Sequence, residues 1–182
     1  KVKKLFKKKN FTYFQCLHTK TIFANPRLKP QLLERFYSDT ESSRYWLNNF
    51  FLPKLNVRIN KIIRPNVNFF SSNFKKYNKK KILDIGAGLG IFLLELKKKW
   101  PKANLFAVEP SKLMANRCRS NNIRVFESTL ERANFKKEKF DVITCFEIFE
   151  HLYDPKFFLK KIYKLLKKKW HFLFYHIKWY GF

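Results

Sequence analysis

From Asn78 onward, short apolar runs alternate with longer segments in which apolar side chains recur every three or four residues. Short strand-like runs separated by helical periods are typical of a parallel sheet covered by helices. The pattern predicts an α/β fold with five strands, over residues 81–85, 104–108, 123–126, 141–146 and 170–176. Helices are predicted between them, over 90–99, from a Ser111 cap to Arg119, and over 155–166.

Residues 1–77 lack this alternation and hold most of the prolines. Two helices are predicted in this part, over 31–37 and 46–51. The stretch 66–80 is rich in Asn, Ser and Lys, which favours a linker into the first strand. The domain organisation expected is therefore an N-terminal accessory segment with its linker, 1–77, and an α/β core, 78–182.

Charge changes this picture in one respect. The chain of 182 residues has 40 Lys and Arg against 13 Asp and Glu, a formal net charge of +27. Such a surface attracts polyanions. Because the lysines come in scattered short runs, typical of an A/T-rich coding sequence, we expect nucleic-acid binding to be weak and non-specific. The shortage of acids leaves some affinity for anions open.

The cellular compartment is predicted from features that the sequence lacks. No apolar run approaches the roughly 20 residues of a membrane span, and the basic N-terminus is not followed by the apolar stretch of a secretory signal. Three cysteines far apart in sequence do not form a disulfide framework. A protein of the reducing cytoplasm, without a membrane span, is expected.

The first strand runs into a glycine-rich turn that contains Gly86, Gly88 and Gly90. Glycine lets the backbone approach a nucleotide-type ligand closely. The spacing is G-x-G-x-G, one residue shorter than the G-x-G-x-x-G dinucleotide fingerprint, which argues against NAD. The second strand ends in Glu109, where an acid can accept both hydroxyls of a ribose. A purely structural turn is the alternative.

Together, ILDIGAGLG at 82–90, FAVEPSK, VFESTLE and FDVITCFEIFEHL resemble the class I S-adenosylmethionine-dependent methyltransferases, over roughly residues 12–182. The resemblance implies a Rossmann-like parallel sheet and S-adenosylmethionine as cofactor, with Asp84 holding its charged methionine end. It also places residues near the adenine and on the floor of the site. The cofactor-binding residues expected are Asp84, Gly86, Gly88, Gly90, Glu109, Thr129, Leu130, Phe146 and Glu147.

After the fourth strand, Glu147, Glu150 and His151 form an E-x-x-E-H string. His151 is the candidate catalytic residue, a general base toward a hydroxyl acceptor, since a histidine pKa lies near the working pH. The string also resembles that of ubiquinone-pathway O-methyltransferases, in which such residues can hold a divalent metal. A loop-shaping role is the third alternative, and no metal site is assigned.

Residues 16–46 resemble the N-terminal part of bacterial small-molecule methyltransferases that carry a zinc module. In those relatives this part contains a C-x-x-C knuckle followed by Gly. Here Cys16 remains, but Thr19 and Lys20 stand in the places of the second Cys and the Gly, so a four-ligand zinc site is not expected. The family sheet has two further strands after the fifth, and Lys1 stands where an initiator Met would be. A fragment, truncated at the C-terminus, is therefore expected.

The function predicted is an enzyme that transfers a methyl group from S-adenosylmethionine to a small-molecule acceptor, such as a sugar or phenolic hydroxyl. The alternative from another class is a non-catalytic Rossmann-like basic module that binds nucleic acid or another polyanion. A nucleic-acid methyltransferase is a further alternative. Against it, the fourth strand is followed by CFEIFEHL, without the N/D-P-P-Y/F tetrapeptide of amino-methylating DNA enzymes.

Overall fold

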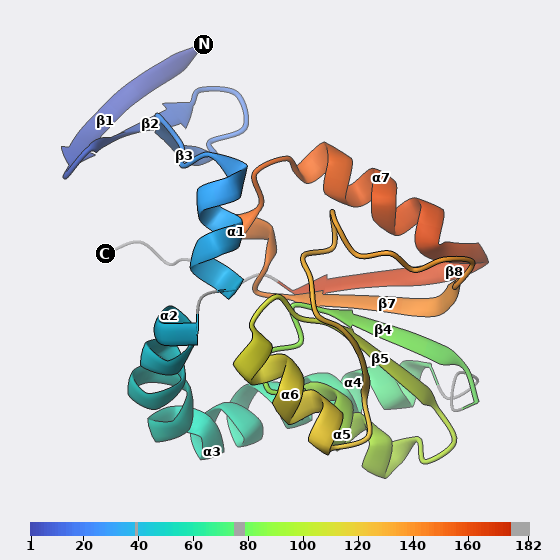
Figure 1. Ribbon diagram of the computed structural model, residues 1–182. Coiled ribbons are helices and arrows are strands. Elements are labelled where there is room, and N and C mark those ends of the chain that lie inside the picture. The colour runs from blue at the N-terminus through green and yellow to red at the C-terminus, as the bar shows by residue number, and fades with distance from the viewer. Residues whose placement is uncertain (39, 75–78, 176–182) are drawn as a thin grey trace. The chain divides into compact units, whose positions relative to one another are not determined.

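The structure is a computed structural model that describes residues 1–38, 40–74 and 79–175 (Figure 1). The chain divides into two compact units, Lys1–Leu33 and Glu34–Phe182. The predicted boundary after residue 77 stays a prediction. No helix in the described part of the chain is long and apolar enough to cross a membrane.

The first unit contains a three-stranded antiparallel sheet that the sequence did not predict. Its strands are β1 (Val2–Lys8), β2 (Phe11–Cys16) and β3 (Ile22–Asn25), in the order β1-β2-β3. Every residue of β1 is exposed, so this strand has no buried side whose alternation could mark it in the sequence. The helix predicted over 31–37 is confirmed as α1 (Pro30–Ser38).

The second unit begins with a run of short helices. They are α2 (Thr40–Trp46), α3 (Leu55–Arg58) and α4 (Arg64–Asn73), joined by π-helical turns over Leu47–Phe51 and Ile59–Ile63 and a 3-10 turn over Leu52–Lys54. The prediction of a linker over 66–80 is wrong for its first half, because α4 extends to Asn73. Val67 and Phe70, one helical turn apart, are each 2% exposed and pack into the core.

A five-stranded parallel sheet forms the centre of this unit, in the order β6-β5-β4-β7-β8. The prediction of this sheet is confirmed. The strands are β4 (Lys81–Ile85), β5 (Asn104–Val108), β6 (Arg124–Phe126), β7 (Phe140–Phe146) and β8 (Leu166–Tyr175). β8 starts four residues before the predicted position, so Lys167 lies in the strand and not in a preceding turn; the predicted end at His176 is outside the described residues.

Helices connect the strands and cover both faces of the sheet (Figure 1). α5 (Ile91–Lys99) and α6 (Lys112–Ser120) follow β4 and β5, and α7 (Pro155–Leu165) follows β7. Ser111 caps α6, as predicted, by accepting a hydrogen bond from Met114 N. α7 packs a stripe on the sheet, made of Phe158, Ile162 and Leu165.

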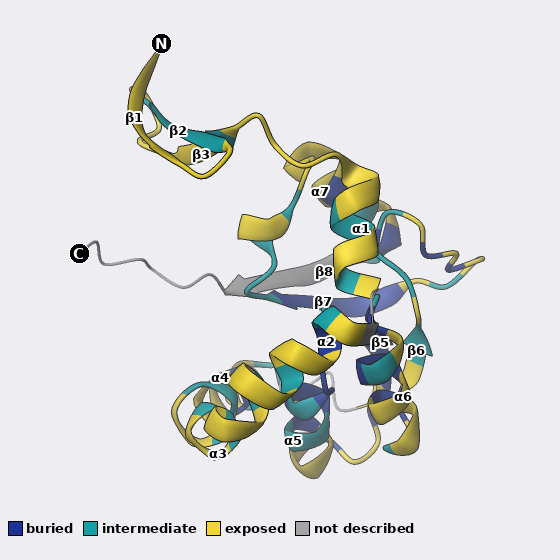
Figure 2. Ribbon diagram, turned by 60° about the vertical axis from the view of Figure 1, so that its left-hand side comes forward, coloured by how far each residue is buried: buried dark blue, intermediate teal, exposed yellow. Residues whose placement is uncertain are grey.

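Alternate residues of the strands contribute to two separate apolar clusters. Ile82 packs in the cluster with α4 and α5, whereas its neighbour Leu83 packs in the cluster with α7. Figure 2 shows buried residues along most of β7. The chain returns across the sheet between β6 and β7, so the strand order reverses beside β4. Ligands of open α/β sheets bind at the carboxyl ends of the strands at such a point.

Candidate active site

The glycine turn connects the end of β4 to α5 and is tied to the neighbouring strand. Gly86 N and Ala87 N both donate to Val108 O, at 2.8 and 3.2 Å, and Gly90 N donates to Ala87 O at 2.9 Å. Gly88 has a φ of +55° and Gly90 a φ of +73°, which side chains rarely allow. The backbone of the turn is therefore held at the carboxyl end of β5.

The surroundings of the three glycines differ. A Cβ on Gly86 would lie 2.2 Å from Ile148 Cδ1, and a Cβ on Gly90 would lie 2.9 Å from both Cys118 Sγ and Ile123 Cδ1. A Cβ on Gly88 would meet no atom within 4 Å. Gly88 is thus the point at which the turn faces open space, and where a ligand can approach its backbone.

Glu109, directly after β5, is held against this turn. Its side chain accepts a hydrogen bond from Gly88 N at 2.7 Å through Oε2, and from Ser111 N at 2.9 Å through Oε1. The residue is only 5% exposed. Burial raises the pKa of Glu109 to about 6, although the two backbone hydrogen bonds favour the charged form. Each carboxylate oxygen keeps capacity for a second donor, such as a ribose hydroxyl.

Asp84 is the second buried acid of the site. It lies on β4 opposite Thr144 of β7, whose hydroxyl donates to Asp84 Oδ1 at 2.8 Å. Burial raises the pKa of Asp84 to about 7, against the effect of the Thr144 hydrogen bond, and the charge of Glu109 adds to the rise. Within the described residues, neither acid forms an ion pair. The site therefore has two buried carboxyls whose ionised forms lack a compensating cation.

Three of the predicted residues follow β6 or end β7. Leu130 is 2% exposed and belongs to the cluster under α7, so its side chain is core. Thr129 is half-buried, and its carbonyl oxygen accepts from Ala133 N at 2.9 Å. Phe146, the last residue of β7, contacts the Phe92 ring edge-on at 4.7 Å.

Glu147 and His151 of the E-x-x-E-H string contact different residues. Glu147 has a φ of +54°, and its Oε2 accepts from Arg58 Nη2 of α3 at 2.8 Å. His151 is exposed at the end of the 3-10 turn Phe149–His151, with its ring edge-on to Tyr37 at 5.9 Å between centroids. Burial, together with the charge of Glu150, raises the pKa of Tyr37. Across residues 1–38, 40–74 and 79–175, no three His, Cys, Asp or Glu side chains gather as metal ligands.

Two contributors were missed from the sequence. Thr144 reaches Asp84 only through the pairing of β4 with β7, 60 residues apart. Arg58 reaches Glu147 from 89 residues earlier in the chain. No local motif marks either residue, because both contacts depend on tertiary structure.

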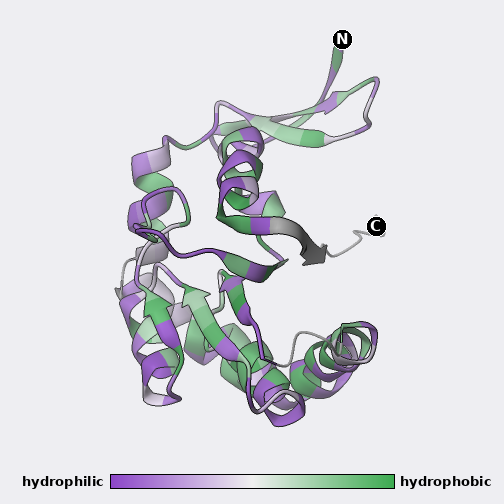
Figure 3. Cartoon of the chain, turned by 90° about the vertical axis from the view of Figure 1, so that its right-hand side faces the viewer, coloured by the Kyte–Doolittle hydropathy of each residue, from purple (hydrophilic) through white to green (hydrophobic). Residues whose placement is uncertain are grey.

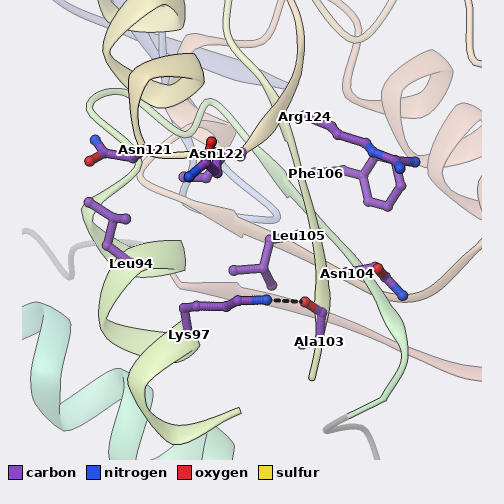
Figure 4. A pocket seen from close by; sticks show the side chains of 10 residues that line it. Leu94, Lys97, Ala103, Asn104, Leu105, Phe106, Asn121, Asn122 and Arg124 are labelled. Carbon is purple, nitrogen blue, oxygen red and sulfur yellow. Dashed lines mark hydrogen bonds between the residues drawn. The ribbon is translucent and has the colours of Figure 1, made fainter. Parts of the chain in front are cut away.

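The hollow shown in Figure 4 lies elsewhere. Its volume is about 320 Å³, and its lining includes Asn104 and Arg124, the first residues of β5 and β6. It is therefore at the amino ends of these strands, opposite the glycine turn. Lys97 Nζ donates to Ala103 O within it, at 2.8 Å.

Comparison with known proteins agrees with this geometry. The family model described as "Methyltransferase domain" matches residues 56–177. None of the curated proteins matches the sequence.

Solved structures with the same fold include methyltransferases. The plantazolicin methyltransferase BpumL in complex with SAH has a TM-score of 0.56 and 18% identity, over 79% of this chain and 60% of its own. Coclaurine N-methyltransferase, bound to N-methylheliamine and SAH, has a TM-score of 0.56 and 21% identity, over 62% of this chain and 35% of its own. An S-adenosylmethionine-dependent methyltransferase from Clostridium acetobutylicum has a TM-score of 0.52 and 24% identity, over 67% and 56%.

The chain thus spans between about a third and three fifths of the length of these structures. At these identities the likeness shows the fold. The family match extends over more than half of the chain, from α3 into the residues after β8. The prediction of a Rossmann-like fold is confirmed, and the chain belongs to the methyltransferase domain family.

Proposed function

We propose that this chain binds S-adenosylmethionine at the carboxyl ends of β4 and β5 and transfers its methyl group to a small-molecule acceptor. One observation carries the proposal: the Glu109 carboxylate is fixed by Gly88 N, in the part of the glycine turn that faces open space. An acid and a free backbone surface then meet at one strand end. This is the arrangement that a ribose and its flanking groups require.

The two buried acids also match the positive charges of the cofactor. Asp84 and Glu109 are buried without an ion-pair partner among the described residues, and S-adenosylmethionine carries a sulfonium and an ammonium group. A cationic ligand would favour the ionised form of both acids. We assign Glu109 to the ribose hydroxyls and Asp84 to the charged methionine end. We assign the backbone of Thr129 and Leu130 to the adenine side, because the Leu130 side chain is buried in the core, and Phe146 and Glu147 to the floor of the site.

When bound, the cofactor supplies a methyl group that is already activated by the positive sulfur. The protein then has mainly to align an acceptor and remove its proton. We assign proton removal to His151, which is exposed on the turn after β7. Its ring nitrogen would accept the proton that the acceptor hydroxyl loses. A sugar or phenolic hydroxyl is the acceptor class proposed.

The ring contact between His151 and Tyr37 supports this role. Tyr37 lies on α1 and limits the orientations of the imidazole from one side, while leaving it exposed. The structural neighbour that is bound to N-methylheliamine supports a small-molecule acceptor, since the same fold in that enzyme holds such a compound together with SAH.

Isothermal titration of the purified chain with S-adenosylmethionine, with its demethylated product and with NAD tests the proposal. The first two should bind and NAD should not. Glu109→Ala removes charge-assisted hydrogen bonds worth about 1.5–3 kcal/mol, which corresponds to binding weakened about 10- to 150-fold. Glu109→Gln keeps the shape and one acceptor oxygen, and serves to separate loss of charge from local unfolding.

Glu138→Ala is the matched control, because it removes an acid near the amino end of β7, where Glu138 pairs with Lys81. It should leave cofactor affinity unchanged. A folded parent chain, as judged by circular dichroism, that binds neither S-adenosylmethionine nor its product contradicts the proposed function. Equal affinity of the parent and a folded Glu109→Ala contradicts only the placement of the ribose.

A further inference from the structure

The first compact unit has an unusual charge. Between Lys1 and Leu33 there are nine Lys and Arg residues and no Asp or Glu. The remaining 149 residues hold 31 bases and 13 acids, from the totals of 40 and 13 in 182 residues. Positive charge in the rest of the chain is therefore partly balanced by neighbouring acids, whereas in this unit it is not.

The sheet of this unit also displays aromatic rings in stacked pairs. Phe6 and Tyr13 are opposite each other on β1 and β2, with ring centroids 4.8 Å apart and planes inclined by 22°. Phe14 and Phe23 are opposite each other on β2 and β3, at 6.0 Å and 24°. Because Tyr13 and Phe14 are consecutive, the two pairs lie on opposite faces of the sheet.

Much of this aromatic surface is accessible. Phe6 is 51% exposed and Phe23 37% exposed. These two rings belong to different stacked pairs, so each face of the sheet offers one partly exposed ring. Large apolar side chains exposed in this way mark interaction surfaces more often than an evenly polar surface does.

Lysines lie beside the rings on both faces. Lys4 is paired with Phe14, and Lys8 is paired with Phe11, two residues from Tyr13 on the same face. Figure 3 shows both hydrophilic and hydrophobic residues on the strands near the end marked N. Cations and flat rings are thus mixed on each face and not separated onto opposite faces.

Mixed rings and cations select one class of polyanion. Single-stranded nucleic acid has unpaired bases that stack on aromatic side chains, and phosphates that lysines neutralise. The bases of a duplex are already stacked on one another. Binding in a lipid interface requires apolar side chains on one face and cations on the other, an arrangement that this sheet lacks.

We infer that the β1–β3 sheet binds single-stranded nucleic acid, with bases against the Phe6–Tyr13 and Phe14–Phe23 pairs and phosphates against the neighbouring lysines. This goes beyond the proposed methyl transfer and is independent of it. The sequence, with its scattered lysine runs, predicted only diffuse attraction. The pairing of the strands places a lysine near a stacked pair of rings on each face of one small sheet, so the binding is confined to this unit while still indifferent to base sequence.

The test is fluorescence anisotropy of the full chain with a labelled single-stranded oligouridylate of about 12 nucleotides, a length within the range of site sizes of such surfaces. Phe6→Leu/Phe23→Leu keeps apolar side chains but removes one ring from each pair. Since stacking of one base changes affinity about 5- to 150-fold, this variant should bind at least about fivefold more weakly. The matched control is Phe157→Leu/Tyr163→Leu, two exposed aromatic residues of α7.

The lysines are tested by salt dependence. Lys4→Gln/Lys8→Gln should reduce the slope of log affinity against log salt by about 1.4, at about 0.7 for each phosphate contact of a single strand. Lys156→Gln/Lys160→Gln on α7 removes the same charge and should change the slope by less than about 0.7, half of the change expected for Lys4 and Lys8. Circular dichroism of each variant establishes that the chain remains folded.

Several outcomes would overturn the inference. The aromatic variant could bind as tightly as the parent, or the α7 lysine pair could weaken binding as much as Lys4 and Lys8 do, in which case the attraction is diffuse. A duplex of the same length that binds as tightly as the single strand would also contradict it. So would binding only to vesicles of phosphatidylcholine and phosphatidylserine, which would indicate a membrane surface.

Discussion

Replacement of Asp84 by asparagine should separate the stability of this chain from its cofactor binding. Asp84 lies on the central strand β4, is 3% exposed and accepts a hydrogen bond from Thr144. Asparagine has almost the same size and keeps an oxygen that can accept this bond, but it has no charge to bury. The substitution therefore removes the electrostatic cost of the acid with little change in packing.

The magnitude follows from the pKa of Asp84, which burial raises from its ordinary value of 3.8 to about 7. At about 1.4 kcal/mol for each tenfold change in proton affinity, this corresponds to at most about 4 kcal/mol. The native state holds the proton more tightly than the unfolded chain does. Stability is therefore lost as the pH rises from about 4 to about 7, and the loss is complete above pH 7.

The assay is urea unfolding followed by circular dichroism between pH 5 and pH 8, on the parent and on Asp84→Asn. The difference in free energy of unfolding should grow with pH and reach up to about 4 kcal/mol in favour of the variant. Titration at pH 8 should show weaker binding of S-adenosylmethionine to the variant, since the carboxylate that we assign to the cationic end of the cofactor is gone. Glu138→Gln, which removes one negative charge near the amino end of β7, controls for the general effect of charge.

Two results would refute this reasoning. A variant less stable than the parent at pH 8 would mean that the ionised carboxylate stabilises the fold. A more stable variant with unchanged affinity for S-adenosylmethionine would mean that Asp84 costs stability without serving the cofactor.

The remaining predictions concern the base and the turn. His151→Ala should lower turnover about 10²-fold and leave the dissociation constant of S-adenosylmethionine unchanged, because the proposed base acts on the acceptor and not on the cofactor; unchanged turnover on the true acceptor would support a loop-shaping role. Gly90→Ala should lower the midpoint of thermal unfolding more than Gly88→Ala, since both have positive φ but only the Cβ at Gly90 meets Cys118 Sγ and Ile123 Cδ1 at 2.9 Å; equal midpoints would contradict this difference.

The sheet could be predicted because its strands are buried on both faces. β4, β5 and β7 are mostly apolar in sequence and almost wholly buried, a pattern typical of parallel strands covered by helices. The N-terminal sheet could not be predicted, since the lysines of β1 are exposed on both faces and leave no period to recognise. α4 was taken for a linker because its Asn and Ser residues outnumber the two apolar side chains that it buries.

Some residues of the candidate site could likewise be predicted from the sequence, and others could not. Asp84, the glycines and Glu109 were recognised because each stands at a strand end that the local sequence defines. The hydrogen bond from Gly88 N to Glu109 joins residues 21 apart, close enough in sequence to belong to one strand-turn-helix-strand unit. Thr144 and Arg58 depend on the order of strands and on the course of the N-terminal helices. A single sequence has no short-range signal for either contact.

If the proposed assignment of the two buried acids is right, they link folding to ligand binding. A ligand present at 100 times its dissociation constant stabilises the native state by about 2.7 kcal/mol. That is comparable with, but smaller than, the upper limit of about 4 kcal/mol that the charge of Asp84 costs above pH 7. Because the ligand cation favours the ionised acids, the affinity for S-adenosylmethionine should rise with pH up to about 7 while the stability of the free chain falls. On the proposed assignment, the same carboxyl lowers the stability of the free chain and raises its affinity for the cofactor, which a purely structural acid would not do.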